Sequence, residues 1–310
     1  MKGTIITNFT IGFGNNIFQY CFGRLLAEKY GMDYHHPPLN ALGIPGSSPA
    51  LDSVLPTFGI TDANYKVIFS KEHPFPASGC NIVVNGYFED YEIYGPHLDK
   101  IRSWFASSAP SNKNTSDLIL HFRLQNRLVQ HAHFINHVPA AAYIRAIEGI
   151  EFDKLHIITD AKKWTPYSES DIFEIHQELS VGPNPPSRAP LVATDDSINY
   201  INSLVDGLAK YEPIIHCSDA EVIPGSGALR GGFMDDFNLI RQFEQVMFKD
   251  STFSWWAATL GGATCVRPFA PWKPNKGAKN KNLGQTNYPG WRGWGTIEDL
   301  THSDVKFIKE

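Results

Sequence analysis

Short β-branched runs alternate with helical patterns along this chain, and this alternation limits its fold more than any other feature. The strand-like runs lie at 3–8, 80–88, 118–122, 155–160, 213–217 and 263–266, and another opens the stretch 246–262. Apolar residues recur at helical spacing between them, at 15–31, 89–105, 143–150 and 234–248. Strands that alternate with helices form parallel sheets of the Rossmann type. We therefore predict an α/β fold.

The length of 310 residues is enough for two domains. The stretch "SSAPSNKNTSD" (107–117) is small and polar and contains one proline, which is typical of a linker. It predicts a boundary between one domain at 1–112 and another at 113–310. Residues 37–60 and 181–200 are predicted to be loops.

Charge, cysteines and hydropathy exclude several classes of protein. A formal net charge of −5 argues against a general binder of nucleic acid or anionic membranes, which carries a basic excess. The four cysteines lie far apart in the sequence and form no C-x-x-C pair, which favours reduced thiols in a cytoplasmic protein. No apolar run approaches the ~20 residues of a membrane span, and the start "MKGTIITNFT" does not resemble a secretory signal. We expect a cytoplasmic protein, and leave peripheral membrane contact and the oligomeric state open.

The segment "GFGNN" (12–16) lies between a predicted strand and a predicted helix. Glycines at such a point let backbone amides approach an anion at the start of the helix. A dinucleotide-binding fingerprint would need a third glycine and an acid about 20 residues later, but the third position here is Ile17. The segment therefore predicts either a tight structural turn or an anion-binding loop, and a dinucleotide oxidoreductase is a remote alternative.

The segment "HFRLQN" (121–126) directly follows the predicted strand 118–122. His121 and Arg123 are therefore expected at the edge of a parallel sheet where such sheets bind ligands. The planar guanidinium of Arg123 suits phosphate oxygens, and an ordinary surface arginine is the alternative.

The segment "DSTFSWW" (250–256) places small hydroxyls beside two tryptophans at a predicted turn into a helix. Free amides at such a turn favour anions. The alternative is that Ser251 or Ser254 only caps the helix and that the tryptophans belong to the core. Together with Arg123 on a neighbouring strand, the segment favours a clamp for a diphosphate.

Metal ligands are not predicted. The three histidines of "HAHFINH" (131–137) have no acid or cysteine nearby to complete a set. "TDD" (194–196) is predicted to lie in a loop, and "MDD" (234–236) to open a helix, where acids complement the dipole.

These motifs, in this order, resemble the family 11 glycosyltransferases, the α-1,2-fucosyltransferases. The opening G-x-G-N-Q-x-F-Q-Y of that family is similar to "GFGNNIFQY" (12–20), and its Ser-Thr-Phe-Ser-Trp-Trp is unbroken at 251–256. Its H-[IV]-R-R-G-D is similar to "HFRLQN". Two further segments are similar to "GYFEDYEIY" (86–94) and "IITDAKKW" (157–164).

The resemblance implies a GT-B-like fold, with two Rossmann-type domains facing across a cleft. The N-terminal domain would serve the acceptor, and the C-terminal domain would bind the nucleotide sugar. The implied reaction is a metal-independent, inverting transfer of L-fucose from GDP-fucose to a glycan hydroxyl, without a cofactor. The implied partners are the nucleotide-sugar donor and an oligosaccharide acceptor, and no nucleic acid.

The resemblance also assigns residues to the site. It implies catalytic roles for Arg123, as the contact to the β-phosphate, for its neighbour His121, and for Asn15, which would reach the phosphate or the acceptor. The donor-binding residues that it implies are Gly14, Arg123, Asp160, Ser251, Thr252 and Phe253.

The central motif departs from the family pattern. Leu124, Gln125 and Asn126 stand where the family has arginine, glycine and aspartate. A different nucleotide-sugar donor, or a relative that binds nucleotide or glycan without turnover, are therefore alternatives. No general base is assigned, and Asp160, Glu89 and His121 are open candidates.

Overall fold

The computed structural model describes residues 3–10, 12–48, 55–69, 79–106, 111–124, 128, 140–180, 194–217, 221–222, 229–230, 232–249 and 251–269. By its contacts the chain divides into two compact units, and the division falls between Ala109 and Pro110. Unit 1 is the N-terminal one and unit 2 the C-terminal one. Both are α/β, and each is built on a parallel sheet, as the alternation of strands and helices predicts.

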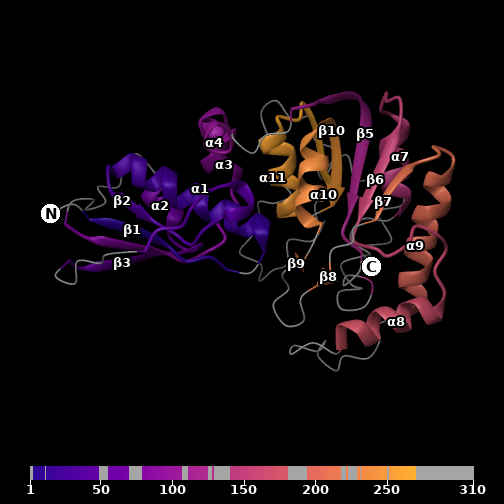
Figure 1. Ribbon diagram of the computed structural model, residues 1–310, viewed down its shortest axis with the longest axis horizontal. Helices are drawn as coiled ribbons and strands as arrows, with labels where there is room; N and C mark the ends of the chain where they lie inside the picture. Colours follow the sequence, from indigo (N-terminus) through magenta and orange to yellow (C-terminus); the bar gives the residue numbers. More distant parts are fainter. Residues whose placement is uncertain are drawn as a thin grey trace. The chain divides into compact units, whose positions relative to one another are not determined.

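Unit 1 contains a four-stranded sheet in which every pair of neighbours is parallel, in the order β2-β1-β4-β3 (Figure 1). Its strands are β1 (Thr4–Thr7), β2 (Asp33–His35), β3 (Thr57–Ile60) and β4 (Asn81–Val84). Ile5 of β1 pairs with Tyr34 of β2 and Ile82 of β4, so β1 lies inside the sheet. Ile5 and Ile82 are fully buried, as expected for β-branched residues of a sheet covered on both faces.

Unit 1 is dominated by one long helix, which follows β1. Its helices are α1 (Phe13–Tyr30), α2 (Tyr65–Phe69), α3 (Tyr91–Tyr94) and α4 (Leu98–Trp104), with 3-10 turns at Asn40–Leu42 and Gly95–His97. Helix α1 ends at Gly31, whose φ of 64° is left-handed, which confirms the predicted stop. It begins at Phe13, earlier than the sequence predicts, because Gly12 already makes the turn with a φ of 104°.

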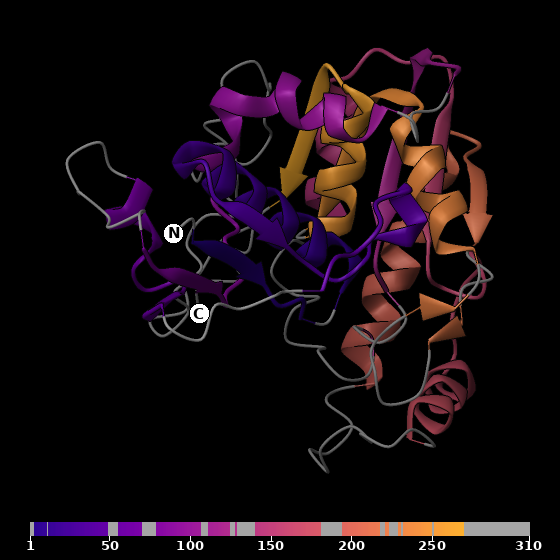
Figure 2. The same cartoon turned by 60° about the vertical axis from the view of Figure 1, so that its left-hand side comes forward.

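Unit 2 contains a five-stranded parallel sheet in the order β11-β10-β5-β6-β7 (Figures 1 and 2). Its strands are β5 (Asn114–Phe122), β6 (Leu155–Thr159), β7 (Ile214–Cys217), β10 (Phe243–Lys249) and β11 (Cys265–Phe269). A small antiparallel pair is formed by β8 (Glu221–Val222) and β9 (Leu229–Arg230). Strand β5 is central, since it pairs with both β10 and β6.

The helices of unit 2 cover both faces of this sheet. They are α7 (Ala140–Glu148), α8 (Glu169–Ser180), α9 (Thr194–Ala209), α10 (Phe233–Arg241) and α11 (Thr252–Gly261). Leu118, Leu120 and Phe122 of β5 point into a core with residues of α7, α8 and α9. The alternate residue His121 points to the opposite face, where it meets α11. Helices α10 and α11 lie side by side (Figures 1 and 2).

Three sequence-based assignments are wrong. Residues 243–248 form strand β10 rather than the end of a helix, which stops at Arg241. The aromatic and branched side chains of 243–248 fit a central parallel strand, where both faces are buried, and their helical spacing is coincidental. Residues 194–200 open helix α9 instead of a loop. Strand β5 begins inside the predicted linker, at Asn114.

Two strands of unit 1, β2 and β3, were missed, because each is short and lies among polar or proline-rich residues. Among the helices of the described residues, none combines the length and the hydropathy that a bilayer crossing requires.

Candidate functional site

The carboxyl edge of the five-stranded sheet gathers most of the predicted site residues. His121 is the last but one residue of β5 and pairs with Phe248 of β10 and Ile158 of β6. Parallel strands end at the same edge of a sheet, and open α/β sheets bind ligands there. The predicted residues that follow or end these strands are His121, Arg123, Asp160, Ser251, Thr252 and Phe253.

His121 is anchored to the first turn of α11. Its Nδ1 lies 2.5 Å from the Oγ of Ser254, and His121 is only 8% exposed. Its ring packs against Phe253, with ring centroids 5.9 Å apart, and Phe253 in turn contacts the ring of Phe237. The sequence therefore places His121 correctly at the strand end, but it gives Ser254 no role beyond a cap.

Burial and one neighbouring charge decide the protonation of the His121 ring. Burial, and then the positive charge of Arg123, lower the pKa of His121 to about 3. The imidazole is therefore neutral at neutral pH. A histidine with so low a pKa is a weak base, which argues against His121 as the general base.

Arg123 is exposed directly after β5. Among the described residues, no carboxylate lies within ion-pair distance of its guanidinium. A guanidinium prefers a bidentate anion such as a phosphate, so the exposed Arg123 is the cation at this edge that suits a phosphate ligand.

Asp160 holds the segment that carries Arg123. Its Oδ1 accepts a hydrogen bond of 2.5 Å from the backbone N–H of Leu124. Leu124 is 3% exposed and belongs to the core beside α7, α8 and α9. Leu124, which stands where the resembled motif has an arginine, is thus an apolar side chain of the core. The motif positions 125 and 126 lie outside the described residues.

The start of α11 confirms the capping alternative for Ser251. Its backbone is extended, and its Oγ accepts from the N–H of Ser254 at 3.3 Å. Trp255 and Trp256 are 1% and 0% exposed, and their rings meet edge to face at 4.7 Å. The tryptophans therefore belong to the core, and they fix the helix whose positive end lies at the sheet edge.

Gly14 and Asn15 lie in unit 1, in the first turn of α1. Gly14 is buried and Asn15 is half-buried. Gln19 holds the loop before this turn, since its Nε2 donates to the carbonyl of Gly86 at 2.7 Å and its Oε1 accepts from the N–H of Thr10 at 3.0 Å. The predicted roles of Gly14 and Asn15 in a shared site stay predictions.

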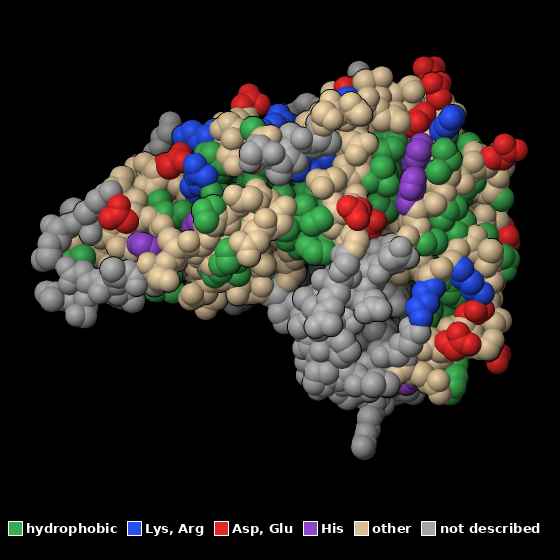
Figure 3. All heavy atoms as spheres, in the orientation of Figure 1, with side chains coloured by type: hydrophobic (Ala, Val, Ile, Leu, Met, Phe, Trp, Pro, Cys, Tyr) green, Lys and Arg blue, Asp and Glu red, His purple; other side chains and the backbone are tan. Residues whose placement is uncertain are grey.

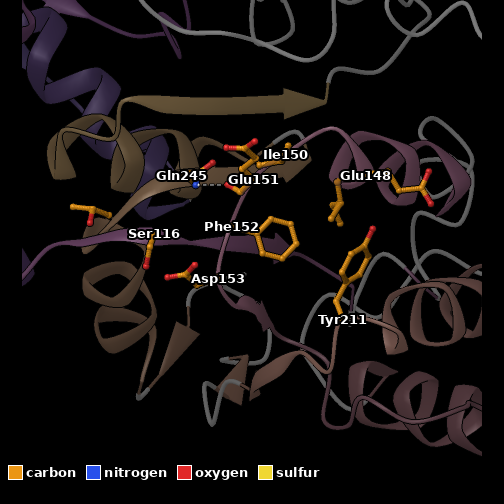
Figure 4. Close-up of a pocket in the computed structure, with 10 residues that line it drawn as sticks. Ser116, Glu148, Ile150, Glu151, Phe152, Asp153, Tyr211 and Gln245 are labelled. Carbon is orange, nitrogen blue, oxygen red and sulfur yellow. Dashed lines mark hydrogen bonds between the residues drawn. The ribbon is translucent and has the colours of Figure 1, made fainter.

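A groove of about 730 Å³ lies at the opposite, amino-terminal edge of the unit 2 sheet (Figure 4). Three carboxylates line it, and Gln245 donates from Nε2 to the carbonyl of Glu151 at 3.0 Å. An anionic diphosphate would be repelled there, and none of the predicted site residues lines this groove. Its lining residues are Thr115, Ser116, Ile147, Glu148, Ile150, Glu151, Phe152, Asp153, Tyr211 and Gln245.

A row of titratable groups crosses the sheet on the face that carries His121. His156 of β6 lies 3.0 Å from His216 of β7 and 3.2 Å from the carboxylate of Asp117 on β5. Histidine side chains reach the surface over β6 and β7 (purple in Figure 3). Burial, and then His156, lower the pKa of His216.

The described part of the chain offers no metal site. Those residues contain no group of three or more histidine, cysteine or acidic side chains that could hold a metal ion. Asp235 and Asp236 lie in the first turn of α10, as predicted. The histidines of 131–137 lie outside the described residues, so the expected independence of metal stays a prediction.

Comparison with known proteins shows only remote similarity. No protein-family model matches the chain. No curated protein matches it either. A solved structure of a mutant of Arabidopsis thaliana FUT1 in complex with GDP superimposes with a TM-score of 0.40 at 10% identity, covering 94% of this chain and 73% of that chain. A similarity at this level does not assign the chain to a family.

Proposed function

We propose that this protein is a metal-independent, inverting glycosyltransferase that moves L-fucose from GDP-fucose to a glycan hydroxyl. One observation carries the proposal. At the carboxyl edge of the unit 2 sheet, Arg123 is exposed without an ion pair among the described residues, beside the neutral His121 and the start of α11.

This edge suits the leaving group of such a transfer. The bond from the sugar to the diphosphate breaks, and negative charge develops on the phosphate oxygens. Arg123 would pair with that charge through its guanidinium, and the positive end of the α11 dipole favours the same charge. Groups held rigidly before the reaction stabilise a transition state most, and the buried Ser254–His121 contact supplies such rigidity.

The GT-B-like arrangement is part of the proposal. Unit 2 would bind the nucleotide sugar, and unit 1 would supply the acceptor side with Gly14 and Asn15. The acceptor hydroxyl would attack the anomeric carbon from the face opposite the diphosphate, which inverts the configuration. The general base is not assigned.

A second candidate keeps this reaction class and changes the donor. Leu124 is buried in the core, so this position offers no second cation to the diphosphate. The absence of a cation at this position supports the candidate with a donor other than GDP-fucose.

The test is a transfer assay with a panel of nucleotide sugars and glycan acceptors in the presence of EDTA. We expect turnover with GDP-fucose. Turnover with another donor would support the second candidate. Tight binding of GDP without turnover of any donor would contradict both and indicate a non-catalytic binder.

A further inference from the structure

A buried hydrogen bond joins strand β5 to helix α11. It links the Oγ of Ser254 and the Nδ1 of His121 at 2.5 Å, across 133 residues of sequence. Ser254 is 0% exposed and His121 is 8% exposed, so solvent does not compete for this bond. Its direction decides which ring nitrogen carries the proton of the neutral imidazole.

The surroundings of Ser254 decide that direction. Among the described residues, Nδ1 of His121 is the only hydrogen-bond partner of the Ser254 Oγ, and so the only group there that its hydrogen can reach. If Nδ1 donated instead, the buried hydroxyl hydrogen would have no acceptor in this part of the chain. Buried polar hydrogens are almost always bonded. The hydroxyl therefore donates to Nδ1, and the ring proton sits on Nε2.

The Nε2–H group is left for a ligand. No described residue accepts a hydrogen bond from it, although Nδ1 is bonded and the ring packs against Phe253. His121 lies at the same strand end as the exposed Arg123. Burial and the charge of Arg123 keep the pKa of His121 at about 3, so the ring stays neutral at neutral pH.

We propose that Ser254 is a positioning residue that fixes neutral His121 as the Nε2–H tautomer, and that this N–H donates to an oxygen of the leaving diphosphate. The second half rests on the proposed function, while the first half does not. The pair supplies an uncharged donor beside Arg123, so the two groups bind one anion without repelling each other.

The tautomer is measured on the full chain labelled with ¹⁵N-histidine, by two-bond proton–nitrogen correlation, with the His121 signals identified by their loss in His121→Gln. We expect a protonated Nε2 and a bare Nδ1 between pH 5 and pH 8. Ser254→Ala should give a mixture of tautomers and a raised pKa. A protonated Nδ1 in the unaltered protein, or an unchanged tautomer in Ser254→Ala, would overturn the assignment.

Transfer assays test whether the Nε2–H of His121 donates to the leaving diphosphate. The amide nitrogen of glutamine reaches the place of Nε2 and that of asparagine the place of Nδ1, so His121→Gln should retain at least about tenfold more kcat than His121→Asn. Ser254→Ala should lower kcat about tenfold and change the donor KM little. The exposed Ser103 of α4 provides the control, and Ser103→Ala should behave as the unaltered protein.

The outcomes separate this inference from the proposed function. The Nε2–H tautomer in a protein that transfers no sugar would sustain the role of Ser254 and overturn its link to a diphosphate. Equal activities of His121→Gln and His121→Asn in an active enzyme would overturn the contact between His121 and the diphosphate, and would leave the proposed function and the tautomer standing.

Discussion

Arg123 and His121 lie two residues apart at one strand end, and they differ in charge, exposure and anchoring. His121 is buried and bonded to Ser254, whereas Arg123 is exposed without an ion pair among the described residues. The end of the strand explains the difference, because His121 still lies within β5, whereas Arg123 lies one residue past its last residue. The neutral His121 therefore holds the strand end against α11, and Arg123 supplies the positive charge of the proposed site.

Arg123→Ala should lower turnover by about 10²–10³, because a charge-assisted contact to the leaving diphosphate is lost. Arg123→Lys should stay strongly impaired, since an ammonium does not copy the planar fork. Steady-state transfer kinetics give the comparison. Arg102 of α4, which pairs with Asp99 on the surface at 3.1 Å, provides the control. Equal activity of Arg123→Ala and Arg102→Ala would place the phosphate elsewhere.

His121 should make the protein less stable in acid. Its pKa in the folded protein is lowered to about 3, whereas in the unfolded chain it titrates near 6.5. As the pH falls below about 6.5, the unfolded chain takes up the proton first, so the free energy of unfolding decreases by up to about 1.4 kcal/mol per pH unit. Urea unfolding between pH 7 and pH 4 measures this slope. His121→Gln should flatten it, and an unchanged slope would contradict the buried neutral ring.

The first turn of α11 combines a cap with a proposed anion contact, and one position separates the two roles. Ser251→Ala should lower the free energy of unfolding by about 1 kcal/mol, because the cap on the Ser254 N–H is lost. Ser251→Asp should keep the cap and the stability, yet weaken GDP binding through the repulsion of two anions. Chemical denaturation and calorimetry measure these effects.

The exposed Ser170 at the start of α8 offers a control. Ser170→Ala should change neither the free energy of unfolding nor the affinity for GDP. If Ser251→Asp bound GDP as tightly as the unaltered protein, the diphosphate would not lie at the start of α11.

The sequence predicts most elements because their physical signals are local. The β-branched residues that mark β5 and β6, and Gly31 that ends α1, are signals carried by a few neighbouring residues. The sequence pattern predicts part of strand β10 as a helix, since a strand buried on both faces lacks the alternation of apolar and polar residues that marks a half-exposed strand. The Ser254–His121 contact could not be predicted, because it joins positions 133 residues apart.

At the scale of the whole molecule, the described residues form two α/β units with parallel sheets, and the predicted donor residues other than Gly14 belong to one of them. The acid-lined groove of that unit lies at the other edge of its sheet. The two edges therefore offer opposite electrostatic environments, and a nucleotide diphosphate is expected only at the edge that carries Arg123.

GDP should stabilise the protein in the presence of EDTA. At about 100 times its dissociation constant it should add about 2.7 kcal/mol to the free energy of unfolding. Thermal unfolding measures the shift, and hydrogen exchange should show protection at the ends of β5 and β6 and at the start of α11. A shift that needs Mg²⁺ or Mn²⁺ would contradict binding through the protein alone.

The burial of Leu124 limits how this site can be engineered. A single Leu124→Arg change would not recreate the two adjacent arginines of the family motif, because the new guanidinium would have to enter an apolar core and leave it without a partner. Any gain in affinity for the donor must come from the solvent side of the strand end. The charge that position 124 can carry is therefore limited by the packing of the core around it.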